Sequence, residues 1–364
     1  VLTIVAKNET DPKKNVDIFQ SALGFKIEGK SHIRSSKHAI TNEPEQRELD
    51  HLYRHTANYA VGHGVAVTWP ELDKNTLLQE LQTTYLPLFY QEVLDFDSAP
   101  SVTMKTLSSA KQEELGALLL PLVLGFEQWI NEETQKSLLS GGVEVVAQQL
   151  SARAKHILAR VKKGYEALTN LSDTNAYTAF KLANQAMFKQ QMNGKRSLRK
   201  WNRDDKKPFA VSQPFKISPP EEPTGNFGSW RPFQLAFLMA VIPGLIDPED
   251  QSREEVDLIF FPTGGGKTEA YLGASAFSIL HQRLTTTQDS ELGVNVLMRY
   301  TLRLLTIQQF ERSSGLICAL EEMRQEDTNL LGTTPISIGV WLGRHTTPNK
   351  RADALVNLKD IKNR

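Results

Sequence analysis

The chain of 364 residues has one cysteine, Cys318, which excludes an internal disulfide framework and any zinc site built from several cysteines. It has no net charge, because 42 Lys and Arg residues balance 42 Asp and Glu residues, so a polyanion would have to bind a local basic surface. The longest apolar stretch, near 117–126, is interrupted by Pro121 and Gly125 and is too short to cross a bilayer. With no signal peptide in the sequence either, we expect a cytoplasmic protein without a membrane partner.

The most informative segment is FPTGGGKT at 261–268. It follows an apolar run at 256–261 that predicts a buried strand, and it precedes a segment at 267–284 that predicts a helix. A strand, a glycine loop and then Gly-Lys-Thr opening a helix is the arrangement that holds a nucleoside triphosphate. The alternative is a glycine-rich turn that happens to precede Lys-Thr.

The residues of this loop have distinct expected roles. Consecutive glycines let the backbone curl so that its N–H groups face phosphate oxygens. The lysine would reach the β- and γ-phosphates of ATP, and the threonine hydroxyl would hold Mg²⁺, so these two residues are also the catalytic candidates. The loop residues expected to bind the cofactors ATP and Mg²⁺ are Thr263, Gly264, Gly265, Gly266, Lys267 and Thr268.

Phe261 occupies the position, six residues before Lys267, at which the general motif has glycine. Helicase-type loops tolerate this departure, whereas small GTPases and most P-loop kinases keep the glycine. A small-molecule kinase is therefore disfavoured.

Gln234 lies in the segment WRPFQ, upstream of the glycine loop. Its amide can donate to and accept from adenine at the same time, and Arg231 could stack on the base. Both residues are therefore candidate nucleotide contacts. The alternative is that Gln234 is an exposed residue at the start of a helix.

Two further positions carry cations where predicted strands end. Arg299, Thr301 and Arg303 follow the apolar segment GVNVLMRY, and the helix N-terminus there would suit a DNA phosphate. Arg344 follows the third predicted strand, ISIGVWLG, in a glycine turn. Ligands of open α/β sheets bind outside the carboxyl ends of strands, so we expect DNA contacts at both positions. Alternatively, the two arginines near Thr301 pair with neighbouring carboxylates.

Changes in composition predict four parts. Residues 1–110 combine short strand and helix patterns, with a helix expected near 49–61, and indicate a mixed α+β or β-rich domain. Residues 111–193 have helical periodicity throughout and indicate a helical subdomain. Residues 194–229 are basic and then rich in Pro and Gly, as in a linker. Residues 230–364 alternate strand and helix patterns, which predicts an α/β fold with a parallel sheet of the RecA-like P-loop type.

ATP hydrolysis requires a second strand that ends in an Asp for Mg²⁺ and a neighbouring acid. No apolar strand after Thr268 ends in two acids. We therefore expect the RecA-like lobe to be incomplete and truncated before this motif, so that the chain alone is inactive. The alternative is a module that binds ATP without hydrolysing it.

The segments RPFQ, FPTGGGKTEAYLG and LMRYTLRLLTIQQFER together resemble superfamily 2 helicases, as a Q motif, motif I and motif Ia in that order. LYRHTANYAVGHGVAVTW and AFKLANQAMFKQQ extend the resemblance, which is closest to the helicase component of the DISARM anti-phage defence system. By this resemblance Gln234 takes the Q-motif role. Lys267 and Thr268 take the motif I roles, and Thr301 and Arg303 take the motif Ia contacts.

The resemblance implies a DNA-dependent ATPase with two RecA-like lobes that moves along DNA and acts with a DrmB-like second helicase-related subunit. Motif II, motif III and the second lobe of such an enzyme are missing from this sequence. A non-hydrolysing regulatory or scaffold module of a DNA-binding complex therefore stays open as the second hypothesis.

Overall fold

A computed structural model describes most of the chain. The described residues are 22–35, 43–54, 56–70, 72, 77–86, 102–139, 144–194, 201–204, 207–211, 228–260, 265–286, 293–300, 303–342, 348 and 350–363. They fall into two compact units, which are described separately: one comprises 1–93 and 133–151, and the other comprises 94–132 and 152–364.

The first unit contains a small antiparallel sheet. Its strands are β1 (Gly24–Lys26), β2 (Ala66–Thr68) and β3 (Glu80–Thr84), in the order β1-β3-β2. The Leu23 amide donates to the Thr83 hydroxyl at 2.7 Å and extends the β1–β3 pairing by one residue. Helix α1 (Pro44–Leu52) begins and ends earlier than the 49–61 expected from the sequence, because Pro44 fits the first helical turn.

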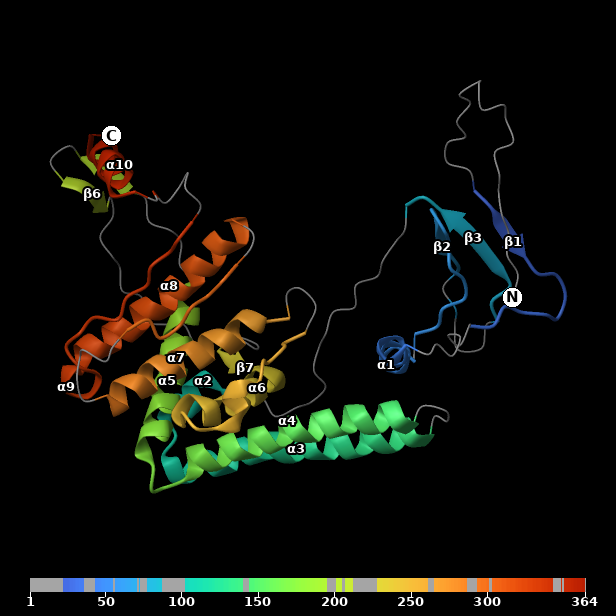
Figure 1. Cartoon of the computed structure of the whole chain (residues 1–364), viewed down its shortest axis with the longest axis horizontal. Coiled ribbons are helices and arrows are strands. Elements are labelled where there is room, and N and C mark those ends of the chain that lie inside the picture. Colours follow the sequence, from blue (N-terminus) through green and yellow to red (C-terminus); the bar gives the residue numbers. More distant parts are fainter. Residues whose placement is uncertain are drawn as a thin grey trace. The chain divides into compact units, whose positions relative to one another are not determined.

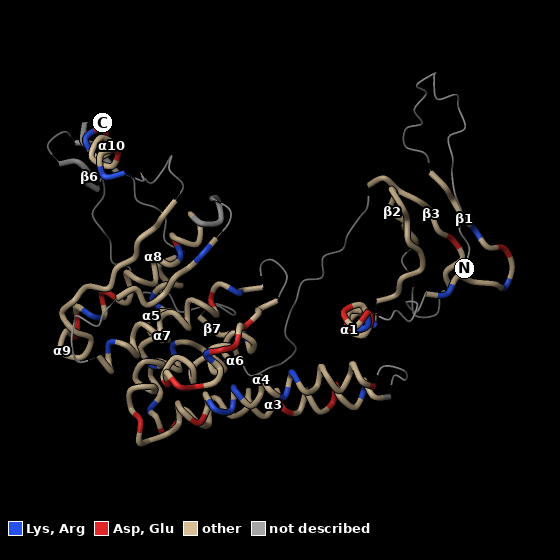
Figure 2. The backbone as a smooth tube through the Cα atoms, viewed as in Figure 1, with Lys and Arg blue, Asp and Glu red and all other residues tan. Residues whose placement is uncertain are grey.

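The second unit is mainly helical, as the periodicity of 111–193 predicts. Figure 1 shows α3 and α4 side by side, with basic and acidic residues interspersed along both in Figure 2. Lys162 on α4 donates to Glu127 on α3 at 2.8 Å. The helices of this unit are α2 (Met104–Ser109), α3 (Gln112–Leu139), α4 (Glu144–Thr169), α5 (Thr174–Gly194), α6 (Pro232–Ile246), η2 (Gln251–Glu254), α7 (Lys267–Thr285), α8 (Arg303–Glu326), α9 (Thr328–Leu331) and α10 (Arg351–Asn363); the ends of α3 and α4 belong to the first unit.

Helix α5 is the centre of the packing in this unit. It contacts α2, α7 and α8, and α6 in turn contacts α7. Small buried residues at helical spacing, Ala176, Ala179, Ala183 and Ala186, let neighbouring helices approach α5 closely. This core fixes α7, and therefore the glycine loop at its N-terminus, in the middle of the unit (Figure 1).

All strand pairs in the described part of the chain are antiparallel. Besides the first sheet they are β4 (Val102–Thr103) with β7 (Ser229–Trp230) and β5 (Trp201–Asp204) with β6 (Lys207–Val211). The β5–β6 hairpin lies in the stretch for which the sequence predicts a linker.

The three segments predicted as parallel strands form neither helix nor strand where the structure describes them. They are 256–260, 293–300 and 336–342. Several of their apolar side chains are strongly exposed, with Val256 97%, Leu258 85% and Phe260 80% accessible, whereas Ile336 at 7% belongs to the core. The parallel RecA-like sheet therefore stays a prediction.

Candidate nucleotide site

Helix α7 begins at the glycine loop. Its N-cap, Gly266, has φ 84° and ψ 24°, a left-handed conformation that residues with a side chain rarely adopt. A Cβ atom at Gly266 would also lie 2.7 Å from Nε2 of Gln234. The backbone conformation therefore favours glycine at this position, and a side chain here would also displace the Gln234 amide. Lys267 and Thr268 follow directly in the first helical turn.

Two side chains from the start of α6 hold this loop. Arg231 donates from Nη1 to the carbonyl oxygen of Gly265 at 2.7 Å. Gln234 donates from Nε2 to the carbonyl oxygen of Gly266, also at 2.7 Å, and accepts from the Arg231 amide through Oε1 at 2.8 Å. The two residues proposed to contact adenine are thus brought to the glycine loop, which lies more than thirty positions further along the sequence.

Gln234 is 3% accessible, so the alternative of an exposed residue at a helix start is wrong. Its bonds to Arg231 and Gly266 use one of the two N–H donors and one of the two oxygen lone pairs of the amide. Contact of Gln234 and Arg231 with a base stays a prediction.

The hydrogen bonds to the Gly265 and Gly266 carbonyls determine which way the N–H groups that follow them point. In a trans peptide unit the C=O and the following N–H point in opposite directions. With the Gly265 and Gly266 carbonyls turned toward Arg231 and Gln234, the N–H groups of Gly266 and Lys267 face the opposite way. Gly266 has no side chain that could cap these amides, and the positive end of the α7 dipole adds to them.

Thr268 belongs to a chain of hydroxyl groups that the sequence did not reveal. Tyr271, one turn later on α7, donates to Oγ1 of Thr268 at 3.0 Å. Tyr300 donates to the Tyr271 hydroxyl at 3.0 Å, and Oε1 of Gln309 on α8 lies 3.4 Å from that hydroxyl. Desolvation by burial and the hydrogen bond to Tyr271 raise the pKa of Tyr300, so its phenol stays protonated.

A second polar contact joins the same turn of α7 to α8. Glu269 forms an ion pair with Arg312, which is one helical turn beyond Gln309 on α8. Burial lowers the pKa of Arg312, and the adjacent Glu269 carboxylate supplies the opposite charge. The first turn of α7 is thus held by α6 on one side and by α8 on the other.

Close packing between Trp230 and α7 also supports the loop. Trp230, just before α6, is 2% accessible, and its Nε1 donates to Oδ1 of Asn184 on α5 at 2.6 Å. A Cβ atom at Gly273 on α7 would lie 2.7 Å from Cη2 of this indole. The absence of a side chain at Gly273 therefore lets α7 lie directly on Trp230.

Charged pairs anchor the segment that leads toward the loop. Arg160 on α4 binds both carboxylate oxygens of Asp257, at 2.6 and 2.8 Å, and Glu255 at 3.2 Å. Asp250 pairs with Lys163 and accepts from the Ser252 amide, and these contacts, with Lys163 the larger cause, lower the pKa of Asp250 to about 2.

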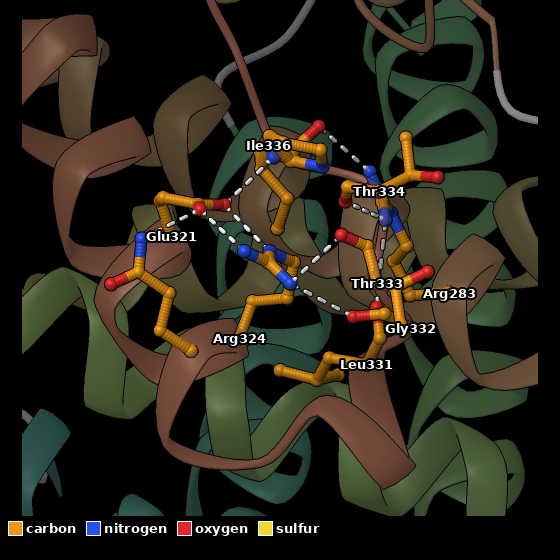
Figure 3. A network of polar contacts seen from close by, with 10 residues as sticks. Arg283, Glu321, Arg324, Leu331, Gly332, Thr333, Thr334 and Ile336 are labelled. Carbon is orange, nitrogen blue, oxygen red and sulfur yellow. Dashed lines mark hydrogen bonds and ion pairs between the residues drawn. The ribbon is translucent and has the colours of Figure 1, made fainter.

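A further network fixes the entry to the third predicted strand (Figure 3). Glu321 and Arg324 of α8 form a double hydrogen bond at 2.7 and 2.8 Å, and the Ile336 amide donates to Glu321 at 2.8 Å. Arg324 also donates to the Gly332 and Thr333 carbonyls. The pKa of Glu321 is lowered to about 2, and the largest cause of this shift is the hydrogen bond from Arg324.

The predicted DNA contacts are only partly visible. Arg299 is exposed in the segment 293–300. Arg303 is the first residue of α8, but its side chain is outside the described part of the structure, as are Thr301, Arg344, Thr263 and Gly264. The structure brings together Arg231, Gln234, Gly265, Gly266, Lys267 and Thr268 and leaves the DNA contacts as predictions.

The part of the chain that the structure describes contains neither a metal-ligand cluster nor a helix that could span a membrane. Within it, no group of three or more His, Cys, Asp or Glu residues is placed to hold a metal ion. No described helix has the length and apolarity needed to cross a membrane.

Comparison with known proteins gives one relative. No protein-family model matches the chain. The DISARM protein DrmA of Bacillus paralicheniformis is 32% identical to it over 374 residues, which cover 98% of this chain and 32% of that protein. The chain is DrmA-like. It spans about a third of the length of this DrmA, and the similarity includes both units of the structure.

Proposed function

We propose that this DrmA-like chain contains the ATP-binding lobe of a DNA helicase or translocase that acts in a DISARM anti-phage defence system. The observation that carries the proposal is the grip of Arg231 and Gln234 on the carbonyls of Gly265 and Gly266. These two hydrogen bonds turn the N–H groups of Gly266 and Lys267 away from α6. A turn that merely happened to precede Lys-Thr would not need two partly buried side-chain hydrogen bonds from the start of another helix.

The residues present fit ATP and Mg²⁺. The amides at the start of α7, the helix dipole and the Lys267 ammonium group all favour phosphate. The Thr268 hydroxyl is a hard oxygen ligand of the kind that Mg²⁺ takes. When bound, Mg²⁺ neutralises charge that develops on the phosphate oxygens. In this proposal Lys267 orients the β- and γ-phosphates, while Arg231 and Gln234 keep the loop in shape and face the base.

The RecA-like sheet is part of the proposal. The segments 256–260, 293–300 and 336–342 alternate along the chain with α6, α7 and α8, as strands do in a parallel α/β sheet. The exposed Val256, Leu258 and Phe260 side chains supply apolar surface that pairing and covering would bury. We infer that these segments pair as parallel strands in the natural full-length protein.

DNA binding and the protein partner rest on the resemblance to superfamily 2 helicases. Arg299, Thr301, Arg303 and Arg344 are the proposed contacts to the phosphate backbone of DNA. The proposed protein partner is a DrmB-like second subunit.

One observation favours a second candidate, an ATP-binding regulatory module without turnover. Glu321 is an acid on α8, beyond the loop, but Arg324, Gln325 and the Ile336 amide engage its carboxylate oxygens. It is therefore committed to structure and is not available for a metal or a water molecule. Turnover would require an acid from elsewhere in the full-length protein.

Two measurements separate the candidates. The 364-residue chain should bind a fluorescent ATP analogue in the presence of Mg²⁺, and Lys267→Ala should abolish this binding. The natural full-length protein should hydrolyse ATP faster when DNA is added. Nucleotide binding together with flat, DNA-independent turnover would support the regulatory module. Absence of nucleotide binding by the wild-type chain would overturn both candidates.

A further inference from the structure

The nucleotide loop and the predicted DNA-contacting segment are joined by the hydroxyl groups of Thr268, Tyr271 and Tyr300. Tyr300 follows Arg299 directly and precedes Thr301. Its hydroxyl donates to Tyr271 at 3.0 Å, and the hydroxyl of Tyr271 donates to Thr268 at 3.0 Å. Two hydrogen bonds thus span the distance between the residue proposed to hold Mg²⁺ and the residues proposed to hold DNA.

The direction of these bonds determines what Thr268 offers. A hydroxyl group has one proton and two lone pairs. Because Tyr300 donates to the Tyr271 oxygen, the single proton of Tyr271 must go to another acceptor. The nearer one is Oγ1 of Thr268, at 3.0 Å against 3.4 Å for Oε1 of Gln309. With one lone pair of Thr268 taken by Tyr271, the other lone pair has a defined direction.

We propose that Tyr271 is a positioning residue that orients the Thr268 hydroxyl for Mg²⁺, and that Tyr300 links this orientation to the segment beginning at Arg299. The inference rests on the proposed ATP-binding function. An outer hydrogen bond to a metal ligand sets the direction of that ligand and strengthens metal binding. Movement of Arg299 and Tyr300 on binding DNA would change the bond from Tyr300, and by reciprocity the occupied metal site would favour one position of these two residues.

Helix α8 gives the linkage a second point of attachment. Gln309 offers Tyr271 an alternative acceptor, and Arg312, one turn further along α8, pairs with Glu269. Both contacts reach the turn of α7 that contains Thr268. Since α8 starts at Arg303, a shift of its N-terminus would change the contacts that Gln309 and Arg312 make with this turn.

Removing single hydroxyl groups tests the proposal. The Mg²⁺ concentration for half-maximal binding of mant-ATP would be measured for the wild-type chain, Tyr271→Phe and Tyr300→Phe. We expect Tyr271→Phe to raise this concentration about two- to tenfold, the effect of one net hydrogen bond. Tyr300→Phe should raise it less, and mant-ATP binding without Mg²⁺ should be unchanged in both variants.

Tyr177→Phe is the matched control. The Tyr177 hydroxyl donates to the Ala110 carbonyl at 2.8 Å, within the same unit but between other elements. This variant loses one phenolic hydrogen bond and should keep the wild-type Mg²⁺ dependence. Thermal melting of all variants verifies that each one folds.

The outcomes separate the two proposals. If wild-type chain binds mant-ATP with Mg²⁺ and Tyr271→Phe has the same Mg²⁺ dependence, the positioning role is wrong and the nucleotide site stands. If the wild-type chain shows no Mg²⁺-dependent binding, the proposed function itself fails. In the full-length protein, Tyr300→Phe should also weaken the effect of DNA on mant-ATP affinity, and an unchanged effect would overturn the linkage to Arg299.

Discussion

The side-chain amide of Gln234 donates a 2.7 Å hydrogen bond to the carbonyl oxygen of Gly266, the N-cap of α7. The buried amide and the left-handed glycine depend on each other. The glycine leaves the space that the amide fills, and the amide holds the peptide that the glycine conformation presents. The preformed shape of the nucleotide loop follows from this pair.

Substituting Gly266 with Ala should damage the loop directly. The left-handed conformation costs a residue with a side chain about 1–2 kcal/mol, and the new Cβ would also clash with Gln234. We expect mant-ATP affinity to fall about five- to thirtyfold, measured by fluorescence titration. Gly125→Ala is the control, because a Cβ at this α3 position meets no atom within 4 Å. Equal affinity of Gly266→Ala and wild type would contradict the account of the loop.

The contact between Gly273 and Trp230 predicts a stability effect. A methyl group at Gly273 would lie 2.7 Å from a fully packed indole, and such overpacking costs about 1–3 kcal/mol. Gly273→Ala should therefore lower the free energy of unfolding, measured by denaturant titration. Gly315→Ala in α8 meets only ordinary contacts, with Gln190 Cγ at 3.6 Å, and should be neutral or stabilising. Similar effects of the two variants would count against close α7–Trp230 packing.

The Glu321–Arg324 pair predicts a pH-dependent contribution to stability. The pKa of Glu321 is about 2 in the folded protein, below its ordinary value of 4.5. Its contribution is therefore fully present above about pH 4.5 and is lost as the pH falls toward 2. Glu321→Gln should melt at a lower temperature than wild type at pH 7, because it leaves the buried Arg324 guanidinium without its charged partner.

The same variant, Glu321→Gln, tests whether this stabilisation falls as the pH is lowered. The difference in melting temperature between wild type and Glu321→Gln should shrink as the pH is lowered from 5 to 3, since Glu321 then takes up a proton in the unfolded chain, where its pKa is 4.5, but not in the folded protein. A difference that stays constant over this range would show that the charge of Glu321 does not stabilise the fold.

The proposed DNA contacts predict a dependence on salt. Binding of a protein to DNA weakens with salt in proportion to the phosphates that it neutralises, with a slope of about 0.9 for each contact on duplex DNA. Arg299→Ala in the full-length protein should weaken DNA binding and reduce this slope by about 1. Lys162→Ala removes one cation that pairs with Glu127 and should leave the slope unchanged. An unaltered slope in Arg299→Ala would remove Arg299 from the interface.

Local sequence signals were enough to predict the helices that form the site, but not the backbone of the segments between them. Pro232 at the start of α6 and Gly-Lys-Thr at the start of α7 define helix starts by backbone chemistry alone. The long helices between 111 and 193 follow from apolar residues at helical spacing, and the structure has them at Gln112–Leu139, Glu144–Thr169 and Thr174–Gly194.

Contacts between distant residues were beyond the reach of such signals. Tyr271, Tyr300 and Gln309 are ordinary residues in their own segments, and only folding brings their polar atoms together. The burial of Gln234 was likewise invisible, because it depends on where α7 packs. Whether 256–260 pairs with other segments depends on partners far along the chain, so an apolar run predicts a strand without showing its neighbours.

The central claim is that the Gly266–Thr268 turn binds ATP to drive movement on DNA, and ATP hydrolysis by the natural full-length protein tests it most directly. Turnover would be measured with and without DNA for wild type, Lys267→Ala and the surface control Lys162→Ala. The account predicts that DNA raises turnover in wild type and in the control, and that Lys267→Ala abolishes it. Turnover in Lys267→Ala equal to that of wild type, with the same response to DNA, would contradict the account.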